Sequence, residues 1–359
     1  MLRFAARIVK DVVRACLCWY ARAEPLSEGE RQHRWRHARR VLVLSAAGIG
    51  DALMATPLLL FLQQRRPSVR LGILTHTRAA PVFQAFPEAE LICYSERAVQ
   101  IGSFLRALWR CRQFRADIFL GAQPCNTLRH ALLAAASRAR LRLRHAPAES
   151  TVRKTACIYH YLCPTPEGRH RVELNLDLFR ALGEQIPEGS LQPFYPVTES
   201  LRERVRRFLP SHLPCVALHP GSGRSEKRWA IENFATLARW LYQQGYHIVL
   251  VGGPGEEPLG AQIAAESGVP VTDLIGRLEF AETAAVLQSC RLVVCNDSGM
   301  MHVAVAVGTP VVAIFVATDP ARIGPYSPRA TSLGNGRGSP PTIEEVIAAV
   351  QYWLHPGTA

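Results

Sequence analysis

Residues 291–315 read RLVVCNDSGMMHVAVAVGTPVVAIF and decide the fold class. A β-rich apolar run ends at Asn296, a tight turn through Gly299 follows, and an apolar segment closed by Gly308 precedes a second β-rich run. These segments predict a strand, a helix and a second strand. Because two parallel strands need a crossover between them, the stretch predicts an α/β domain with a parallel sheet.

The same alternation continues on both sides of this stretch. Strands and helices alternate from residue 215 to residue 290, the run 310–316 is expected to be the final strand, and a helix is expected at the C-terminal end. Toward the N-terminus, strands are predicted at 41–46, 69–76 and 116–122, and helices at 51–64, 131–144 and 173–183; the C-terminal helix is predicted at 342–354. Several β-strands alternating with helices are typical of βαβ units.

Pro and Gly residues accumulate between Pro187 and Pro214, which indicates a domain boundary. We predict two Rossmann-like domains, over 41–197 and over 198–359 with a terminal helix, preceded by a basic amphipathic helix and connector over 1–40. Two such domains are expected to face a central cleft, because ligands bind at the carboxyl ends of parallel strands.

Composition excludes several classes of protein. The chain has 359 residues, of which 48% are hydrophobic and 20% charged, so it is neither disordered nor a coiled coil. No apolar run is long enough for a spanning helix. The ten cysteines lack zinc-site spacing. They are expected to be small buried apolar residues in a reducing compartment.

The positive charge lies in the first half of the chain. The formal net charge is +13, with +6 over residues 1–40, +8 over 41–190 and −1 over 191–359. This distribution predicts an anionic partner for the first half, either a phosphorylated substrate at an anionic membrane or a nucleic acid, for which no motif is found. Residues 2–20 have basic and apolar faces and predict a helix in a membrane interface. A helix packed on its own domain is the alternative.

Four loops carry candidate chemistry. The first follows the strand at 41–46 and contains Gly48, Gly50 and Asp51. Leu53 stands where a dinucleotide fingerprint has its third glycine, so the evidence for NAD is weak. Asp51 is either a charge in the first turn of a helix or a general base.

The remaining loops belong to the second half of the chain. HPGSGRSEKRW at 219–229 offers glycines, hydroxyls and cations that suit a diphosphate. The turn after the strand in 291–315 places a helix N-terminus at an anion site, and the segment 316–320 is expected to line the same cleft. The loop at 219–229 could instead be an exposed loop with incidental charge, and the other two could be ordinary turns that cap a helix or end a strand. The candidate residues are Ser222, Lys227, Asp297, Ser298, Gly299 and His302.

Together the loops resemble glycosyltransferase family 9, the ADP-heptose:lipopolysaccharide heptosyltransferases. The resemblance extends from Val41 to about Pro328. It rests on the pieces GIGDALMATPLL, HPGSGRSEKRWAIENFATLARWL, VLVGGPGE and LVVCNDSGMMHVAVAVGTPVVAIF, with TDPAR and GPY after them. The family implies a GT-B fold with the acceptor on the N-terminal domain and a nucleotide sugar on the C-terminal domain. It also implies inverting transfer without a metal or other cofactor.

The resemblance also assigns roles to residues. Asp51 matches the catalytic aspartate that deprotonates the acceptor hydroxyl, with Gly48 and Gly50 on the acceptor side. Lys227 matches the lysine that contacts the donor phosphates, and Ser222 lies in the donor loop. The D-[ST]-G-x-x-H turn that holds the donor is matched by Asp297, Ser298, Gly299 and His302, and a donor-side glycine turn by Gly252 and Gly253.

The family further implies a phosphorylated glycolipid acceptor and a location on the cytoplasmic face of the inner membrane. The chain departs from the family at Val316-Ala317, where Gly-Pro is usual, and Met300 replaces a common Pro. Because of the first departure, the resemblance does not identify the donor sugar. Alternatives are another nucleotide sugar, a protein acceptor, an NAD-binding oxidoreductase, and a non-catalytic glycolipid-binding paralogue.

Overall fold

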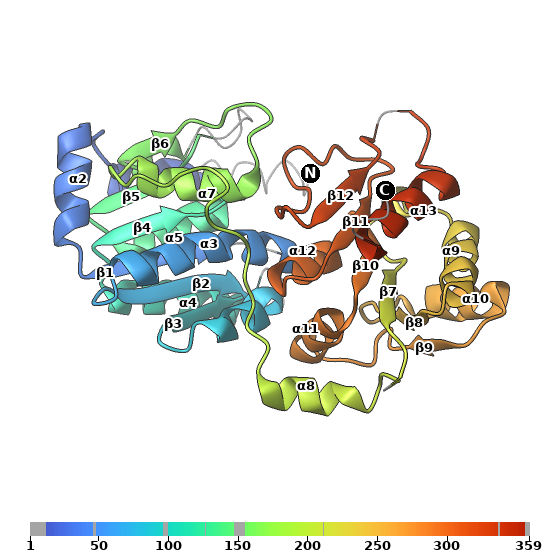
Figure 1. Ribbon diagram of the computed structural model, residues 1–359. Coiled ribbons are helices and arrows are strands. Elements are labelled where there is room, and N and C mark those ends of the chain that lie inside the picture. Colours follow the sequence, from blue (N-terminus) through green and yellow to red (C-terminus); the bar gives the residue numbers. More distant parts are fainter. Residues whose placement is uncertain are drawn as a thin grey trace, which may run out of the picture. The chain divides into compact units, whose positions relative to one another are not determined.

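The computed structural model describes residues 12–45, 48–95, 100–125, 127–146, 155–210, 212–336 and 338–355. The chain divides into two compact units, residues 1–191 and residues 192–359, which we call unit 1 and unit 2. Each unit has its own parallel sheet with helices packed on it, and each is described by itself (Figure 1).

Unit 1 is built on a six-stranded sheet in which all neighbouring strands are parallel. The spatial order is β3-β2-β1-β4-β5-β6, the strand order of a Rossmann fold. The order reverses between β1 and β4, and ligands bind at such a reversal, beyond the carboxyl ends of the strands. The strands are β1 (Arg40–Ser45), β2 (Arg70–His76), β3 (Glu90–Tyr94), β4 (Ile118–Gly121), β5 (Leu141–His145) and β6 (Tyr161–Cys163).

Helices cover both faces of this sheet. Side chains alternate along a strand, so Leu42 and Leu44 of β1 point to one face and Val41 and Val43 to the other. Leu42 and Leu44 share a core with α4, α5 and Leu17 of the helical segment 12–20, whereas α3 packs with α7. The helices are α2 (Glu28–His37), α3 (Ile49–Arg65), α4 (Ile101–Phe114), α5 (Leu128–Ser137) and α7 (Arg171–Arg180), with 3₁₀ turns at Thr77–Ala85 and Ala156–Ile158.

Unit 2 repeats this topology. Its sheet has the order β12-β11-β10-β7-β8-β9, again all parallel, with the reversal between β7 and β10. A core around Trp229 and Phe234 joins the sheet to α9 and α13. The strands are β7 (Cys215–His219), β8 (His247–Leu250), β9 (Val271–Asp273), β10 (Leu292–Asn296), β11 (Val311–Ile314) and β12 (Ala330–Leu333). The helices are α8 (Glu199–Arg206), α9 (Ile231–Gln243), α10 (Glu257–Ser267), α11 (Phe280–Ser289), α12 (Gly299–Ala306) and α13 (Ile343–Leu354).

Two expectations about secondary structure were wrong. The single helix predicted at 131–144 is the end of α5 followed by β5. The alternation of leucine and arginine in β5 has the period of a strand, but both residue types are buried, because Arg142 and Arg144 donate hydrogen bonds to backbone carbonyls. The run at 310–316 is also not the final strand, since β12 pairs with β11 at the edge of the sheet.

The expectation for the cysteines was wrong at one pair. Cys18 and Cys157 form a disulfide, with their Cα atoms 5.8 Å apart. It ties the helical segment 12–20 to the 3₁₀ turn at Ala156–Ile158. The other eight cysteines are free, and six of these are buried.

The amphipathic helix predicted at 2–20 lies partly outside the described residues. Residues 12–20 are helical, and Leu17 packs into the core of unit 1 while Trp19 and Tyr20 are exposed. Among the described residues, no helix combines the length and the apolar character needed to cross a bilayer.

Candidate active site

Asp51 lies where β1 gives way to α3. Gly48 is the N-cap of α3 in an extended conformation, and Asp51 falls in the first turn of the helix, one residue after Gly50. A Cβ on Gly48 would lie 3.4 Å from Oδ2 of Asp51, so the glycine leaves room for the carboxylate. Because β1 borders the reversal of strand order, this loop occupies the ligand-binding edge of the sheet.

The surroundings of Asp51 raise the basicity of its carboxylate. Its side chain is 19% exposed, and its carboxylate pairs with the guanidinium of Arg171, the first residue of α7. Burial raises the pKa of Asp51, and this effect outweighs the lowering by Arg171 and by the hydrogen bond from the backbone of Gly48. A carboxylate with a raised pKa is suited to general base catalysis. Arg171 was not predicted as a site residue.

Two buried hydroxyls lie at the same edge of unit 1. Ser45 ends β1 and is in register with Thr75 of β2. Neither side-chain oxygen has a hydrogen-bond partner among the residues that the structure describes. Buried polar atoms normally have partners, so this pair points to a polar group supplied from outside the described chain. Sequence analysis did not single out these residues.

In unit 2, the carboxylate of Asp297 joins three of the predicted loops. Lys227 Nζ lies 2.6 Å from Oδ2 of Asp297, and the hydroxyl of Thr318 donates to the same oxygen at 2.6 Å. Ser222 Oγ donates to the backbone carbonyl of Asp297 at 2.8 Å. The structure therefore brings together Ser222, Lys227 and Asp297, as well as the segment that carries Val316-Ala317.

The side chain of Asn296 holds the loop that carries Lys227 against the end of β10. Its side chain is fully buried at the end of β10. Its Oδ1 accepts from the backbone N–H of Trp229 at 3.0 Å, and its Nδ2 donates to the carbonyl of Pro220 at 2.8 Å. Both ends of the loop that carries Lys227 are thus fixed to β10. The signal in the sequence was a polar residue ending an apolar strand, but it was not named as a site residue.

The N-terminus of α12 adjoins Asp297. Ser298 is its N-cap, Gly299 its first residue, and His302 lies buried in its first turn. The hydroxyl of Ser298 is buried and has no hydrogen-bond partner among the described residues. A helix N-terminus beside an unsatisfied hydroxyl offers donors to an anionic ligand.

The glycine turn after β8 surrounds a carboxylate. Glu256 accepts a hydrogen bond from the backbone N–H of Gly253 at 2.8 Å, and its Oε2 lies 4.0 Å from Nδ1 of His219. A Cβ on Gly252 would lie 2.8 Å from the same carboxylate. Burial lowers the pKa of His219. Glu256 was missed by sequence analysis, although GGPGE places an acid directly after the glycines.

The segment that departs from the family pattern is tightly packed. Gly336 has a φ of +69°, and a Cβ there would lie 2.6 Å from the carbonyl carbon of Ala317. The backbone after Val316 is therefore covered by the loop that follows β12. Among the described residues, no three His, Cys, Asp or Glu side chains are grouped so that they could hold a metal ion.

Comparison with known proteins identifies the family. Residues 106–352 match the model of glycosyltransferase family 9 (heptosyltransferase). Lipopolysaccharide heptosyltransferase 3 of Escherichia coli is 26% identical over 285 residues, covering 75% of this chain and 81% of that protein. Two solved structures show the fold. A family 9 glycosyltransferase from Veillonella parvula has a TM-score of 0.76 at 22% identity, with 88% of this chain and 97% of that one covered.

The E. coli ADP-heptose lipopolysaccharide heptosyltransferase II has a TM-score of 0.74 at 23% identity, with coverage of 89% and 100%. The two Rossmann-like sheets and these neighbours confirm the predicted GT-B fold. The match to the family model covers more than half of the sequence. The chain therefore belongs to glycosyltransferase family 9.

Proposed function

We propose that this chain transfers heptose from ADP-heptose to the inner core of a lipid A-linked lipopolysaccharide acceptor, with inversion and without a metal. The family supports glycosyl transfer, and the relatives above are named for heptose, lipopolysaccharide and, in one case, ADP-heptose. The observation that carries the proposal is the group of Ser222, Lys227 and Asp297 beside the N-terminus of α12. It combines a cation, hydroxyls and backbone N–H groups, which suit a diphosphate.

The chemistry begins at Asp51. Its carboxylate accepts the proton of an acceptor hydroxyl, and the oxygen attacks the anomeric carbon of the donor sugar. A new C–O bond forms on one face of that carbon while the bond to the phosphate oxygen breaks on the other, so the configuration inverts. The raised pKa of Asp51 makes it a stronger base than an ordinary aspartate.

Lys227 stabilises the leaving group. The ADP that departs carries added negative charge, and an ammonium close to the diphosphate stabilises that charge in the transition state. Asp297 and the hydrogen bond from Thr318 hold the lysine–carboxylate pair in place. The N–H groups of Ser298 and Gly299 at the start of α12 complete the proposed phosphate site. Gly252, Gly253 and Glu256 would receive the hydroxyls of the nucleotide sugar.

Unit 1 would bind the acceptor. Gly48, Gly50, Asp51 and the unsatisfied hydroxyls of Ser45 and Thr75 lie at its ligand-binding edge. A phosphorylated glycolipid suits the excess positive charge of the first half of the sequence. Because such an acceptor is embedded in a membrane, the enzyme is proposed to act as a peripheral protein on the cytoplasmic face of the inner membrane.

The family assignment argues against the NAD-binding oxidoreductase considered above. Another nucleotide sugar remains the main competing donor. Val316-Ala317 lies directly before Thr318, which contacts Asp297, so this segment can alter the shape of the donor site. The assay described next also tests a protein acceptor and a non-catalytic role, because neither predicts ADP release that depends on the core acceptor.

The test is release of ADP when purified protein is mixed with ADP-heptose and a heptose-deficient core acceptor in the presence of EDTA. We expect release that depends on both substrates and is unchanged by EDTA. GDP- and UDP-sugars serve as control donors that test whether the enzyme uses another nucleotide sugar. ADP release only without EDTA would contradict metal independence, and no release despite ADP binding would exclude this donor and acceptor pair.

A further inference from the structure

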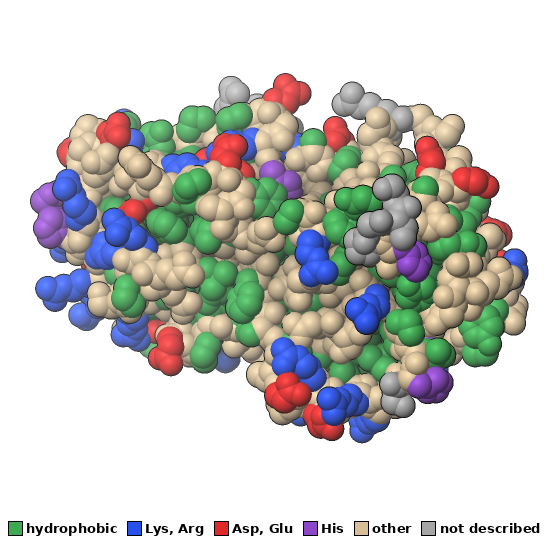
Figure 2. Space-filling model, viewed as in Figure 1, with side chains coloured by type: hydrophobic (Ala, Val, Ile, Leu, Met, Phe, Trp, Pro, Cys, Tyr) green, Lys and Arg blue, Asp and Glu red, His purple; other side chains and the backbone are tan. Residues whose placement is uncertain are grey.

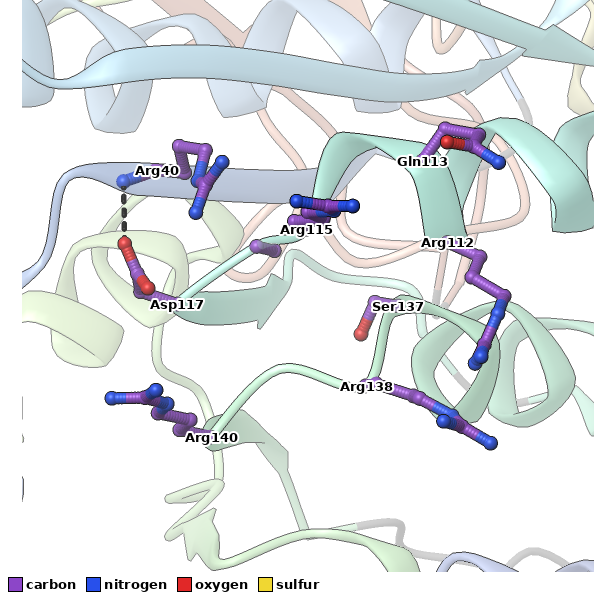
Figure 3. A pocket seen from close by; sticks show the side chains of 9 residues that line it. Arg40, Arg112, Gln113, Arg115, Asp117, Ser137, Arg138 and Arg140 are labelled. Atoms are coloured by element: carbon purple, nitrogen blue, oxygen red, sulfur yellow. Dashed lines mark hydrogen bonds between the residues drawn. The ribbon is translucent and has the colours of Figure 1, made fainter.

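A pocket of about 400 Å³ in unit 1 is lined by five arginines. Figure 3 shows their side chains around a common opening at the amino ends of β1, β4 and β5. This edge is opposite to the one that carries Asp51, about 17 Å away along β1. The pocket is therefore separate from the candidate active site. The arginines are Arg40, Arg112, Arg115, Arg138 and Arg140.

The positive charge of this pocket is not neutralised within the described residues. Asp117 is the one carboxylate among the lining residues, and its Oδ2 already accepts the backbone N–H groups of Arg39 and Arg40 at 2.9 Å each. None of the five guanidinium groups forms an ion pair with a carboxylate in the described part of the chain, and Arg40 Nε is buried without a partner. Such a pocket favours an anion.

Two of these arginines occupy strained backbone positions. Arg115 and Arg138 follow α4 and α5 with φ of 53° and 50°, and no other described residue apart from glycine has a positive φ. Left-handed backbone costs a residue with a side chain about 1 kcal/mol, and glycine is the usual residue at the end of a helix. Strain of this kind gathers at functional sites. Here it occurs at two arginines that line the pocket.

An apolar stripe leads to the same pocket. Ile101, Leu105 and Trp109 recur every four residues on α4 and are 66%, 58% and 61% exposed. Over about 12 Å they follow the helix toward its C-terminal end, where Arg112 and Arg115 line the pocket. Three large exposed apolar side chains in one row form a contact surface rather than scattered exposure.

The segment 12–20 adds aromatic side chains to this face. Trp19 and Tyr20 are exposed, and the guanidinium of Arg138 lies over the ring of Tyr20 and donates to its hydroxyl. The segment, α4 and α5 pack on one face of the sheet, and none of the three contains Asp or Glu. By contrast, the face of the molecule in Figure 2 has acidic and basic side chains interspersed.

We propose that this α4/α5 face docks on an anionic membrane, with Ile101, Leu105 and Trp109 in the interfacial layer and lipid phosphates in the arginine pocket. Aromatic and aliphatic side chains beside arginines are the composition that binds such an interface. A soluble anion or a nucleic acid would use the arginines and leave the aliphatic stripe without a role. The proposal agrees with the proposed membrane-embedded acceptor, but it is tested on vesicles that contain neither donor nor acceptor.

The experiment measures binding of the full chain to sedimented vesicles. We expect binding to phosphatidylcholine vesicles that contain phosphatidylglycerol and little binding to pure phosphatidylcholine. The double variant Arg115→Gly/Arg138→Gly should bind about 30-fold more weakly, because each arginine near an anionic surface contributes about five-fold. Its melting temperature should not fall, since glycine relieves the left-handed strain. The double variant Arg206→Gln/Arg207→Gln removes the same charge from unit 2 and should bind as the unaltered protein does.

A second variant tests the stripe. Trp109→Ser should weaken binding to the anionic vesicles although it changes no charge. Equal binding by the glycine variant and the unaltered protein would overturn the proposal, as would equal binding to both kinds of vesicle. It is also overturned if single-stranded RNA or inorganic phosphate binds in the pocket while anionic vesicles do not. Failure of the transferase assay would leave each of these results unchanged.

Discussion

At the scale of single residues, Asp51 combines a proposed catalytic role with a cost in stability. Its carboxylate is largely buried beside Arg171, and this partial burial outweighs the ion pair, so its pKa is raised. Asp51→Asn removes the proton acceptor and keeps the shape. We expect transfer to fall by about 10²–10⁴-fold while ADP binding is retained. Product formation and calorimetric ADP binding check this, with Glu203→Gln on the exposed side of α8 as a control outside the site. Full activity in Asp51→Asn would exclude the base role.

The same residue predicts a pH dependence. Because the folded pKa of Asp51 lies above its unfolded value, the folded protein binds the proton more tightly, and stability falls as the pH rises through the folded pKa. Asp51→Asn mimics the protonated form, so it should melt at a higher temperature than the unaltered protein at neutral pH. The difference should disappear on acidification. Thermal melts from about pH 3, below the usual pKa of an aspartate, to about pH 8 test this. A lower melting temperature at neutral pH would show that the Arg171 pair outweighs burial.

Lys227 and Asp297 act as a pair. Asp297 is nearly buried, so Lys227→Met leaves an uncompensated carboxylate, and loss of one partner of such a pair costs about 3–5 kcal/mol. The double variant Lys227→Met/Asp297→Asn should recover most of this stability but not the transferase activity, because the ammonium at the leaving group is still absent. Chemical denaturation and rate measurements separate the two effects. Recovery of activity in the double variant would show that Lys227 is structural.

At the scale of elements, the loop after β12 packs against the segment that carries Thr318 in the proposed donor site. Gly336→Ala combines a positive φ with a Cβ 2.4 Å from the backbone nitrogen of Thr318. We expect lower stability and weaker ADP binding, because Thr318 contacts Asp297. Gly308→Ala is the matched control, since its φ is +82° and nothing lies within 4 Å of its Cβ. It should cost about 1 kcal/mol of stability and leave ADP binding unchanged. Equal ADP affinity in both variants would contradict the supporting role.

The elements also show what could be predicted from sequence. The β-rich runs before Asp51 and Asp297 were recognised because fully buried parallel strands are continuous apolar runs. The short edge strands β3, β6, β9 and β12 were not predicted. They are only partly buried, so their sequences lack the continuous apolar run of a buried strand. β5 was misassigned because arginines are rarely buried.

The sequence also predicted part of the candidate site. The residues in distinctive loops were named, and the structure places Ser222, Lys227 and Asp297 in contact. Arg171 was missed because its role depends on a contact with Asp51, which is distant in sequence. Thr318 was included only as part of the segment 316–320, and Glu256 was not named although it directly follows the glycine turn. The strained arginines of the pocket could not be foreseen either, since nothing in the sequence marks a left-handed arginine.

At the scale of the whole molecule, the charge difference between the two halves predicts a salt effect. Exposed charges are screened at high ionic strength. Since residues 1–190 carry the net positive charge and 191–359 are nearly neutral, raising NaCl from about 50 to about 500 mM should raise the KM for the phosphorylated acceptor. The KM for the donor should change little. Steady-state kinetics with each substrate varied in turn measure both, and equal sensitivity of the two KM values would contradict the assignment of the acceptor to unit 1.

The division at residue 191 has a consequence for synthesis of the protein. All six strands of the first sheet, and both cysteines of its disulfide, lie before that division, so unit 1 needs nothing from unit 2 to complete its topology. Domains fold as units while the ribosome is still translating. Unit 1 can therefore be fully assembled during translation of the second half, and the nascent chain would already present its α4/α5 face to a bilayer before the donor site exists.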